Sequence, residues 1–172
     1  MISPDHVRLM ARYNAWQNQN LYGAALTLDE AARRLDRGAF FKSIHGTLCH
    51  ILWADQIWMS RLASSPKPAV PQSESAGMIE EWPLLQNERV AFDDFITSWA
   101  DTLAADALRG PLRWYSGAMK AEVSIPLWVC ITHMFNHQTH HRGQAHALLT
   151  EAGARPHDTD LFMMPEAMNT PA

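Results

Sequence analysis

The sequence predicts an all-α protein, an antiparallel four-helix bundle with a short extended insert before the last helix. The first observation is that apolar residues recur at steps of three and four over four long segments. Helix start signals precede these segments, and Gly- or Pro-containing stretches separate them. A third observation is that four of the nine histidines fall within nine residues of the last segment, at helical spacing. Bundles build metal sites from such inward-facing side chains.

The first helix is predicted to begin after Ser3. Ser3 can cap it, Pro4 suits the first helical position, and Asp5 complements the positive end of the helix dipole. The apolar pattern continues to about Leu26. A charged connection containing Gly follows over residues 29–38, where we expect no long element.

The second helix is predicted over residues 44–62, with Ser43 as its cap. One apolar stripe runs along it at steps of three and four, and Asp55 is a polar residue within that stripe. Residues 64–73 are rich in Pro and Ser and are predicted to form a loop. Neither side of this loop could build a core alone, so residues 1–172 are expected to form a single domain.

The pattern changes after the third helix, which is predicted from Trp82 or Pro83 to Ala105. Residues 108–125 form two short extended runs around a turn.

The fourth helix carries the histidines. Ser124 is its expected cap, Pro126 is tolerated in its first turn, and Gly153 follows its end. We expect the tail over residues 155–172 to pack along the bundle without forming a helix.

Composition excludes several classes of function. Net charge is −4 and the basic residues are scattered, which argues against a nucleic-acid partner. No apolar stretch approaches the length of a membrane span, and the N-terminus lacks the pattern of a signal peptide, so we expect no membrane association. Cys49 and Cys130 form no CxxC motif and are expected to be buried thiols in a reducing, cytoplasmic protein.

The spacing of His133, His137 and His141 places them on one face of the fourth helix, with His140 beside them. Side chains four residues apart stand about 5–6 Å apart, so two of these imidazoles can bind one ion. The outer pair is separated by about 12 Å, at 1.5 Å per residue, so one ion cannot bind all three. The helix therefore supplies two ligands, either the first pair or the second, and a third comes from elsewhere.

His50 is the best candidate for the third ligand on the pattern alone. It lies beside the apolar stripe of the second helix, in a position that faces a neighbouring helix. His45 is in the first turn, where an exposed capping role is an equal interpretation. The other histidines are expected at the ends of the chain or on the far side of the fourth helix: His6, His157 and His146.

Three motifs together resemble the DinB family of bacterial metalloenzymes. They begin at Tyr13 (Tyr-Asn-Ala-Trp-Gln-Asn), at Ser43 (Ser-Ile-His-Gly-Thr-Leu, leading to His50-Ile-Leu-Trp-Ala-Asp) and at His137 (His-Gln-Thr-His-His-Arg-Gly-Gln). Gln17 replaces the Ala that is usual in the first motif. The resemblance extends from about residue 8 to 162, with the motifs in the expected order and at the expected separations.

The resemblance implies an up-down-down-up bundle that holds one divalent ion with His50, His137 and His141. It also implies a homodimer. The wider superfamily includes enzymes that transfer or isomerise substrates with low-molecular-weight thiols such as bacillithiol and mycothiol.

Three neutral imidazoles leave coordination positions open, as in a catalytic site. Zinc or nickel is the expected ion, and imidazole also suits iron. The ion can activate either a thiol or a water molecule, towards a small-molecule substrate. No Glu occupies the place of the base in His-Glu-x-x-His hydrolases, which favours a thiol transferase or isomerase over a hydrolase. A metal- or ligand-binding stress protein without turnover is a further alternative.

Several neighbouring residues have two interpretations each. Asp55 either orients a metal ligand or forms a salt bridge, and Arg142 either binds a substrate carboxylate or forms a structural ion pair. His133 and His140 either line a pocket or transfer a proton. Trp53 and Trp128 are the tryptophans most suited to lining a pocket, since the remainder are expected in the core.

Overall fold

The first helix forms where the sequence signals place it. In the computed structural model, which describes residues 2–117 and 119–169, α1 spans Pro4–Leu26. The Ser3 hydroxyl accepts a hydrogen bond from the backbone N–H of His6 at 3.2 Å, as predicted for its cap. The connection after α1 contains a short helix that the sequence pattern did not predict, α2 (Glu30–Arg34), capped by Asp29.

The second long helix, α3, spans Ile44–Leu62 and also agrees with prediction. Ser43 accepts a hydrogen bond from the backbone N–H of Gly46 at 3.0 Å. The following loop contains one 3₁₀ segment, η1 (Gln72–Gly77), which packs against α3.

The third long helix and the insert follow. Helix α4 spans Trp82–Thr102 and ends before the predicted Ala105, and a 3₁₀ turn, η2, covers Ala107–Arg109. Strands β1 (Pro111–Ser116) and β2 (Ala121–Pro126) pair antiparallel. The prediction of a mostly helical chain with a short extended insert before the last long helix is confirmed.

The last long helix, α5, spans Leu127–Glu151. The expected cap was wrong: Ser124 lies within β2 opposite Arg113, and Pro126 precedes the helix. Gly153 adopts φ +85°, the left-handed conformation predicted for the residue after a helix end.

The tail does form short helical turns, contrary to expectation. They are η3 (Leu161–Met163) and α6 (Glu166–Asn169). Residues 155–169 of the tail nevertheless lie along α1, as expected, and the Tyr13 hydroxyl donates a hydrogen bond to the Thr159 carbonyl at 2.5 Å. Residues 170–172 of the predicted tail lie outside the described residues.

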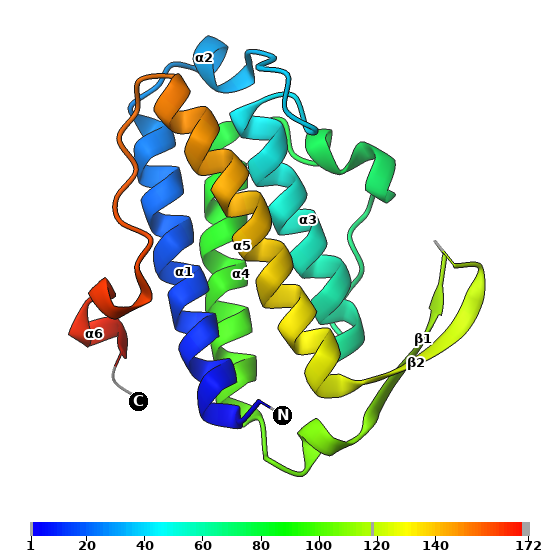
Figure 1. The fold of residues 1–172 in the computed structure, drawn as a ribbon. Helices are drawn as coiled ribbons and strands as arrows, with labels where there is room; N and C mark the ends of the chain where they lie inside the picture. The colour runs from blue at the N-terminus through cyan, green and yellow to red at the C-terminus, as the bar shows by residue number, and fades with distance from the viewer. Residues whose placement is uncertain (1, 118, 170–172) are drawn as a thin grey trace.

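Four long helices, α1, α3, α4 and α5, lie side by side, and the β1–β2 hairpin extends away from them (Figure 1). Helices α1 and α4 are antiparallel, because the end of α1 meets the start of α4: Tyr22 stacks on Trp82 with ring centroids 5.4 Å apart. Helices α3 and α5 are also antiparallel, since His50 contacts His141 near one end and Trp58 contacts His133 nearer the other.

A buried polar network joins the four long helices between two apolar clusters. Arg89 of α4 donates to Asp55 of α3 at 2.7 Å, and it pairs with Asp93 at 2.9 Å. Asp93 accepts from Asn18 of α1 at 2.9 Å. Gln138 of α5 donates to Asp55 at 2.8 Å, so every long helix contributes. Burying charged groups is tolerable here because they are paired and hydrogen-bonded.

Within the described residues, no helix is both long enough and apolar enough to cross a membrane.

Candidate metal site

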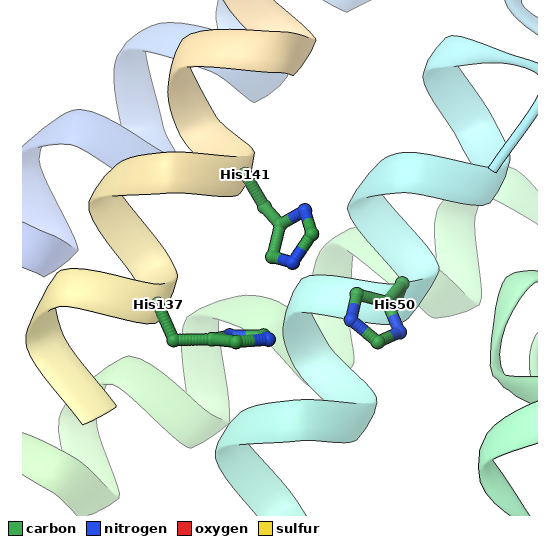
Figure 2. A group of neighbouring side chains, drawn as sticks. All are labelled: His50, His137 and His141. Carbon is green, nitrogen blue, oxygen red and sulfur yellow. The ribbon is translucent and has the colours of Figure 1, made fainter. Parts of the chain in front are cut away.

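Three histidine side chains converge between α3 and α5 at about the level of the polar network. His50 extends from α3, and His137 and His141 extend from α5 towards it (Figure 2). One ring nitrogen from each can be chosen so that all three lie within 4.8 Å of one another. The ring centroids are 5.4 Å apart for His50 and His137 and 4.4 Å apart for His137 and His141. This arrangement is compatible with a metal ion.

The structure selects one of the two histidine pairs that the spacing allowed. His137 and His141 face His50 together, whereas His133 does not join the group. The His133 ring instead packs on Trp58, with centroids 4.9 Å apart. His140 is exposed, and its ring lies beside the Gln144 side chain. Both pairs share the helical step of four residues, so it is the packing of α3 on α5 that brings the second pair, and not the first, to His50.

Two hydrogen bonds orient the imidazoles. His141 Nδ1 lies 2.7 Å from Gln144 Oε1, and His50 Nδ1 lies 2.9 Å from Ser75 Oγ. An amide oxygen only accepts, so Nδ1 of His141 carries the proton and Nε2 keeps a free lone pair. Ser75 is buried in η1. If its hydroxyl oxygen accepts the hydrogen bond from His50 Nδ1, Nε2 of His50 likewise keeps a free lone pair. Metal-binding histidines commonly donate their other ring N–H to such partners.

The electrostatics keep the three imidazoles neutral. Burial, with His141 and His137 nearby, lowers the pKa of His50 to about 3. Burial, with His141 the nearest of three further histidines, lowers the pKa of His137 to about 4. Burial also lowers the pKa of His141. Only a neutral imidazole has a lone pair to give a cation, so this donor set fits a divalent metal ion.

Aromatic rings enclose His50. Phe41 stacks on the imidazole of His50, with ring centroids 3.8 Å apart and an angle of 19° between the ring planes. Trp53 also stacks on this imidazole, with ring centroids 5.9 Å apart. Phe41 also contacts His141 edge-on at 5.4 Å. Phe41 thus holds the ring planes from the loop before α3, and Trp53 contacts His50 from α3 itself.

A pocket of about 730 Å³ opens beside the three histidines. His50, His137 and His133 line it from the helices, and Trp114 lines it from the hairpin. Trp53, as predicted, and Trp58 form part of its wall; Trp128 does not line it. Among the described residues that line it, none is Asp or Glu. A small molecule in this pocket would contact the histidine site directly.

The prediction that Asp55 orients a metal ligand is wrong, because its carboxylate contacts no histidine. Its two oxygens accept hydrogen bonds from Arg89 and Gln138, so the salt-bridge interpretation is confirmed. The ion pair expected of Arg142 does not form among the described residues: the side chain is buried and donates instead to Asn14 and, at 3.2 Å, to Thr139.

The remaining candidates lie away from the site. His45 is buried, contrary to the capping interpretation, and its Nε2 lies 2.7 Å from the Ile79 carbonyl oxygen. His6 and His157 are exposed, and His146 lines a separate pocket between α1 and α5. Both cysteines, Cys49 and Cys130, are buried free thiols, as predicted.

Sequence reasoning missed three residues of the site. Gln144 stands three residues after His141, a spacing at which helical side chains meet, so its role had a local signal. Ser75 and Phe41 lie in loops that tertiary packing brings to His50, and no local pattern indicates them.

Comparison with known proteins gives two matches and one absence. A family model described as "DinB family" matches residues 3–170. Protein DinB of Bacillus subtilis (strain 168) is 26% identical over 167 residues, with 88% of this chain and 90% of that protein covered. No solved structure matches.

Proposed function

The chain belongs to the DinB family, and from this premise and the geometry of the site we propose that it is a divalent-metal-dependent enzyme. Its reaction would be the activation of a low-molecular-weight thiol for transfer or isomerisation of a small-molecule substrate. The observation that carries this proposal is the convergence of three neutral imidazoles beside an open pocket.

His50, His137 and His141 would hold the ion. Zinc or nickel is the expected ion and iron would also suit imidazole ligands. Once bound, the ion would supply a Lewis acid that favours deprotonation of a thiol or of water at an open position. His133 lines the pocket, 5.9 Å from His137 between ring centroids, and is placed to accept a proton there.

Two observations favour this proposal over its alternatives. A hydrolase of the usual metal type uses a carboxylate as general base, and the described lining of the pocket contains none. A sequestration protein would be expected to surround its ion with a fourth protein ligand. The group of potential ligands among the described residues contains three histidines and no fourth member. Both observations support a site that leaves room for substrate.

We also propose that the four long helices form the up-down-down-up four-helix bundle that the family resemblance implies, as a single domain over residues 1–172. The contacts of α1 with α4 and of α3 with α5, both antiparallel, support this topology. A homodimer is the proposed assembly, and light scattering of the purified protein tests it.

The first experiment is elemental analysis of untagged protein that has been purified without nickel-affinity chromatography. We expect about one zinc, nickel or iron per chain, which follows from a single three-histidine site. The loaded protein is then screened with thiols and with electrophiles such as epoxides, enones and alkyl halides. A protein that is empty and takes up no added metal would overturn the proposal. Turnover that is independent of thiol would favour the hydrolase.

A further inference from the structure

We propose that the pocket beside the three histidines binds a small organic carboxylate, with Arg61 as the residue that holds its acid group. This inference deepens the proposed function and rests on it for the role of the pocket. The three histidines alone do not specify which class of molecule binds in the pocket, whereas Arg61 does.

Arg61 lies near the end of α3 and lines the pocket together with His50 and His133. Its guanidinium carbon lies 4.6 Å from the ring centroid of Trp58 and 5.2 Å from that of Trp114. Two aromatic faces therefore position the guanidinium group. The planes of these two rings meet at 70°, so the guanidinium can stack face-on on at most one of them, and its remaining N–H donors are available to a carboxylate.

The charge of Arg61 has no acidic counterpart among the described residues. Across residues 2–117 and 119–169, no Asp or Glu forms an ion pair with it, although seven such pairs occur elsewhere. The side chain is half-buried, and burial lowers its pKa. An incompletely hydrated cation without an anionic partner is a costly arrangement, and a bound anion would offset that cost.

The rest of the pocket also favours an anion. Its described lining contains no acidic side chain, so Arg61 meets no competing carboxylate. A divalent ion held by neutral imidazoles would add two further positive charges near the same space. Like-signed charges that line a cleft with apolar walls concentrate ligands of the opposite sign.

The walls indicate what the anion carries. Ile57 and Trp58 of α3 and Trp114 and Met119 of the hairpin contribute apolar surface. A single arginine fork matches the planar carboxylate, and these walls suit an apolar body attached to it. The acid group could belong to the thiol or to the molecule that the thiol attacks, and the experiment below separates these two sources.

The test compares matched ligands by calorimetry on the metal-loaded protein. The probes are 3-phenylpropionate, its amide 3-phenylpropanamide, phenyl phosphate, and the thiol acid 3-mercaptopropionate. We expect an acid to bind more tightly than its amide by about ten- to a hundredfold, the range of charge-assisted hydrogen bonds. Arg61→Met should abolish this preference. Arg113→Met, on the exposed face of β1, should retain it.

The thiol acid and the thiol-free acid identify the source of the carboxylate. If Arg61→Met weakens 3-mercaptopropionate alone, the acid group belongs to the thiol; if it weakens 3-phenylpropionate, the second substrate carries it. Equal affinity for acid and amide, wild-type affinity in Arg61→Met, or a preference for phenyl phosphate would overturn the proposal. Should Arg61→Met fail to fold, the acid–amide comparison on wild-type protein and the variant Arg61→Lys decide it.

Metal content of the same samples separates this inference from the proposed function. A protein that prefers 3-phenylpropionate through Arg61 but binds no metal would refute the enzyme proposal alone. A protein that binds one metal ion but shows no Arg61-dependent preference would refute the carboxylate inference alone.

Discussion

His141 and Gln144 form a hydrogen bond along one face of α5, with Nδ1 and Oε1 2.7 Å apart. The relationship sets the tautomer of His141, because the amide oxygen accepts and the ring N–H must point to it. Nε2 is then the nitrogen left for a cation. Gln144 is not itself a candidate ligand, but its hydrogen bond decides that Nε2 of His141 is the atom available to a metal ion.

The first prediction concerns the three converging histidines. His50→Ala, His137→Ala and His141→Ala should each abolish stoichiometric metal binding, because two imidazoles on this scaffold leave the ion with too few protein ligands. Metal content after dialysis is the measurement, with circular dichroism to show that the helices remain. One tightly held ion in His50→Ala would refute its assignment.

The matched controls are the two neighbouring histidines of α5 that lie outside the group. His133→Ala and His140→Ala should retain one ion per chain. Loss of the ion from either would show that the wrong helical pair has been assigned. His133→Ala should also lower turnover if this residue accepts the proton of the thiol.

The second prediction concerns the residues that orient the imidazoles. Gln144→Ala should weaken metal affinity by roughly 10–100-fold without removing the site, as is usual for partners of metal-binding histidines. Competition with a chelator measures the change. Gln19→Ala, an exposed glutamine of α1, is the control and should leave affinity unchanged. Ser75→Ala should resemble Gln144→Ala, since Ser75 contacts His50.

The third prediction concerns pH. In metal-free protein the pKa of His50 is lowered to about 3 and that of His137 to about 4, whereas unfolded histidine titrates near 6.5. The unfolded chain therefore binds more protons between these values, and stability falls as the pH drops below about 6.5. The slope is at most about 1.4 kcal/mol per pH unit for each proton of difference.

Urea unfolding of chelator-treated protein between pH 7.5 and pH 5 measures this effect, with the pH values chosen to span the titration of unfolded histidine at about 6.5. His50→Gln should lose stability less steeply than the wild type, because glutamine does not titrate. Identical slopes for the two proteins would contradict the lowered pKa of His50.

The fourth prediction concerns the buried network. Arg89 and Asp55 are 2% and 1% exposed, so Arg89→Met would leave Asp55 and Asp93 without their cation. We expect a loss of about 3–5 kcal/mol in the free energy of unfolding, typical of a broken buried pair. The control is Arg109→Met, whose exposed pair with Asp106 should contribute at most about 1 kcal/mol. Similar losses for both variants would contradict this account.

Local signals predicted the long helices well and the segments between them less well. The caps Ser3 and Ser43 act within one turn of the residues they cap, so the sequence alone placed the starts of α1 and α3. Ser124 is different: it could have capped α5, but strand pairing with Arg113 places it in β2. The hairpin is held by pairing between residues on opposite sides of a turn. A cap signal reports only on the residues next to it in sequence, so it could not predict this pairing.

The sequence by itself determined the helical class and the spacing of His137 and His141, because both follow from the period of one helix. The pattern made His50 the best candidate for the third ligand but gave it no partner on α5, and it left Asp55 with two interpretations. Tertiary structure decided both, since the antiparallel packing of α3 on α5 brings His50 to the other two histidines and Arg89 to Asp55. Such partners are distant in sequence, and only the packing of whole helices makes them neighbours.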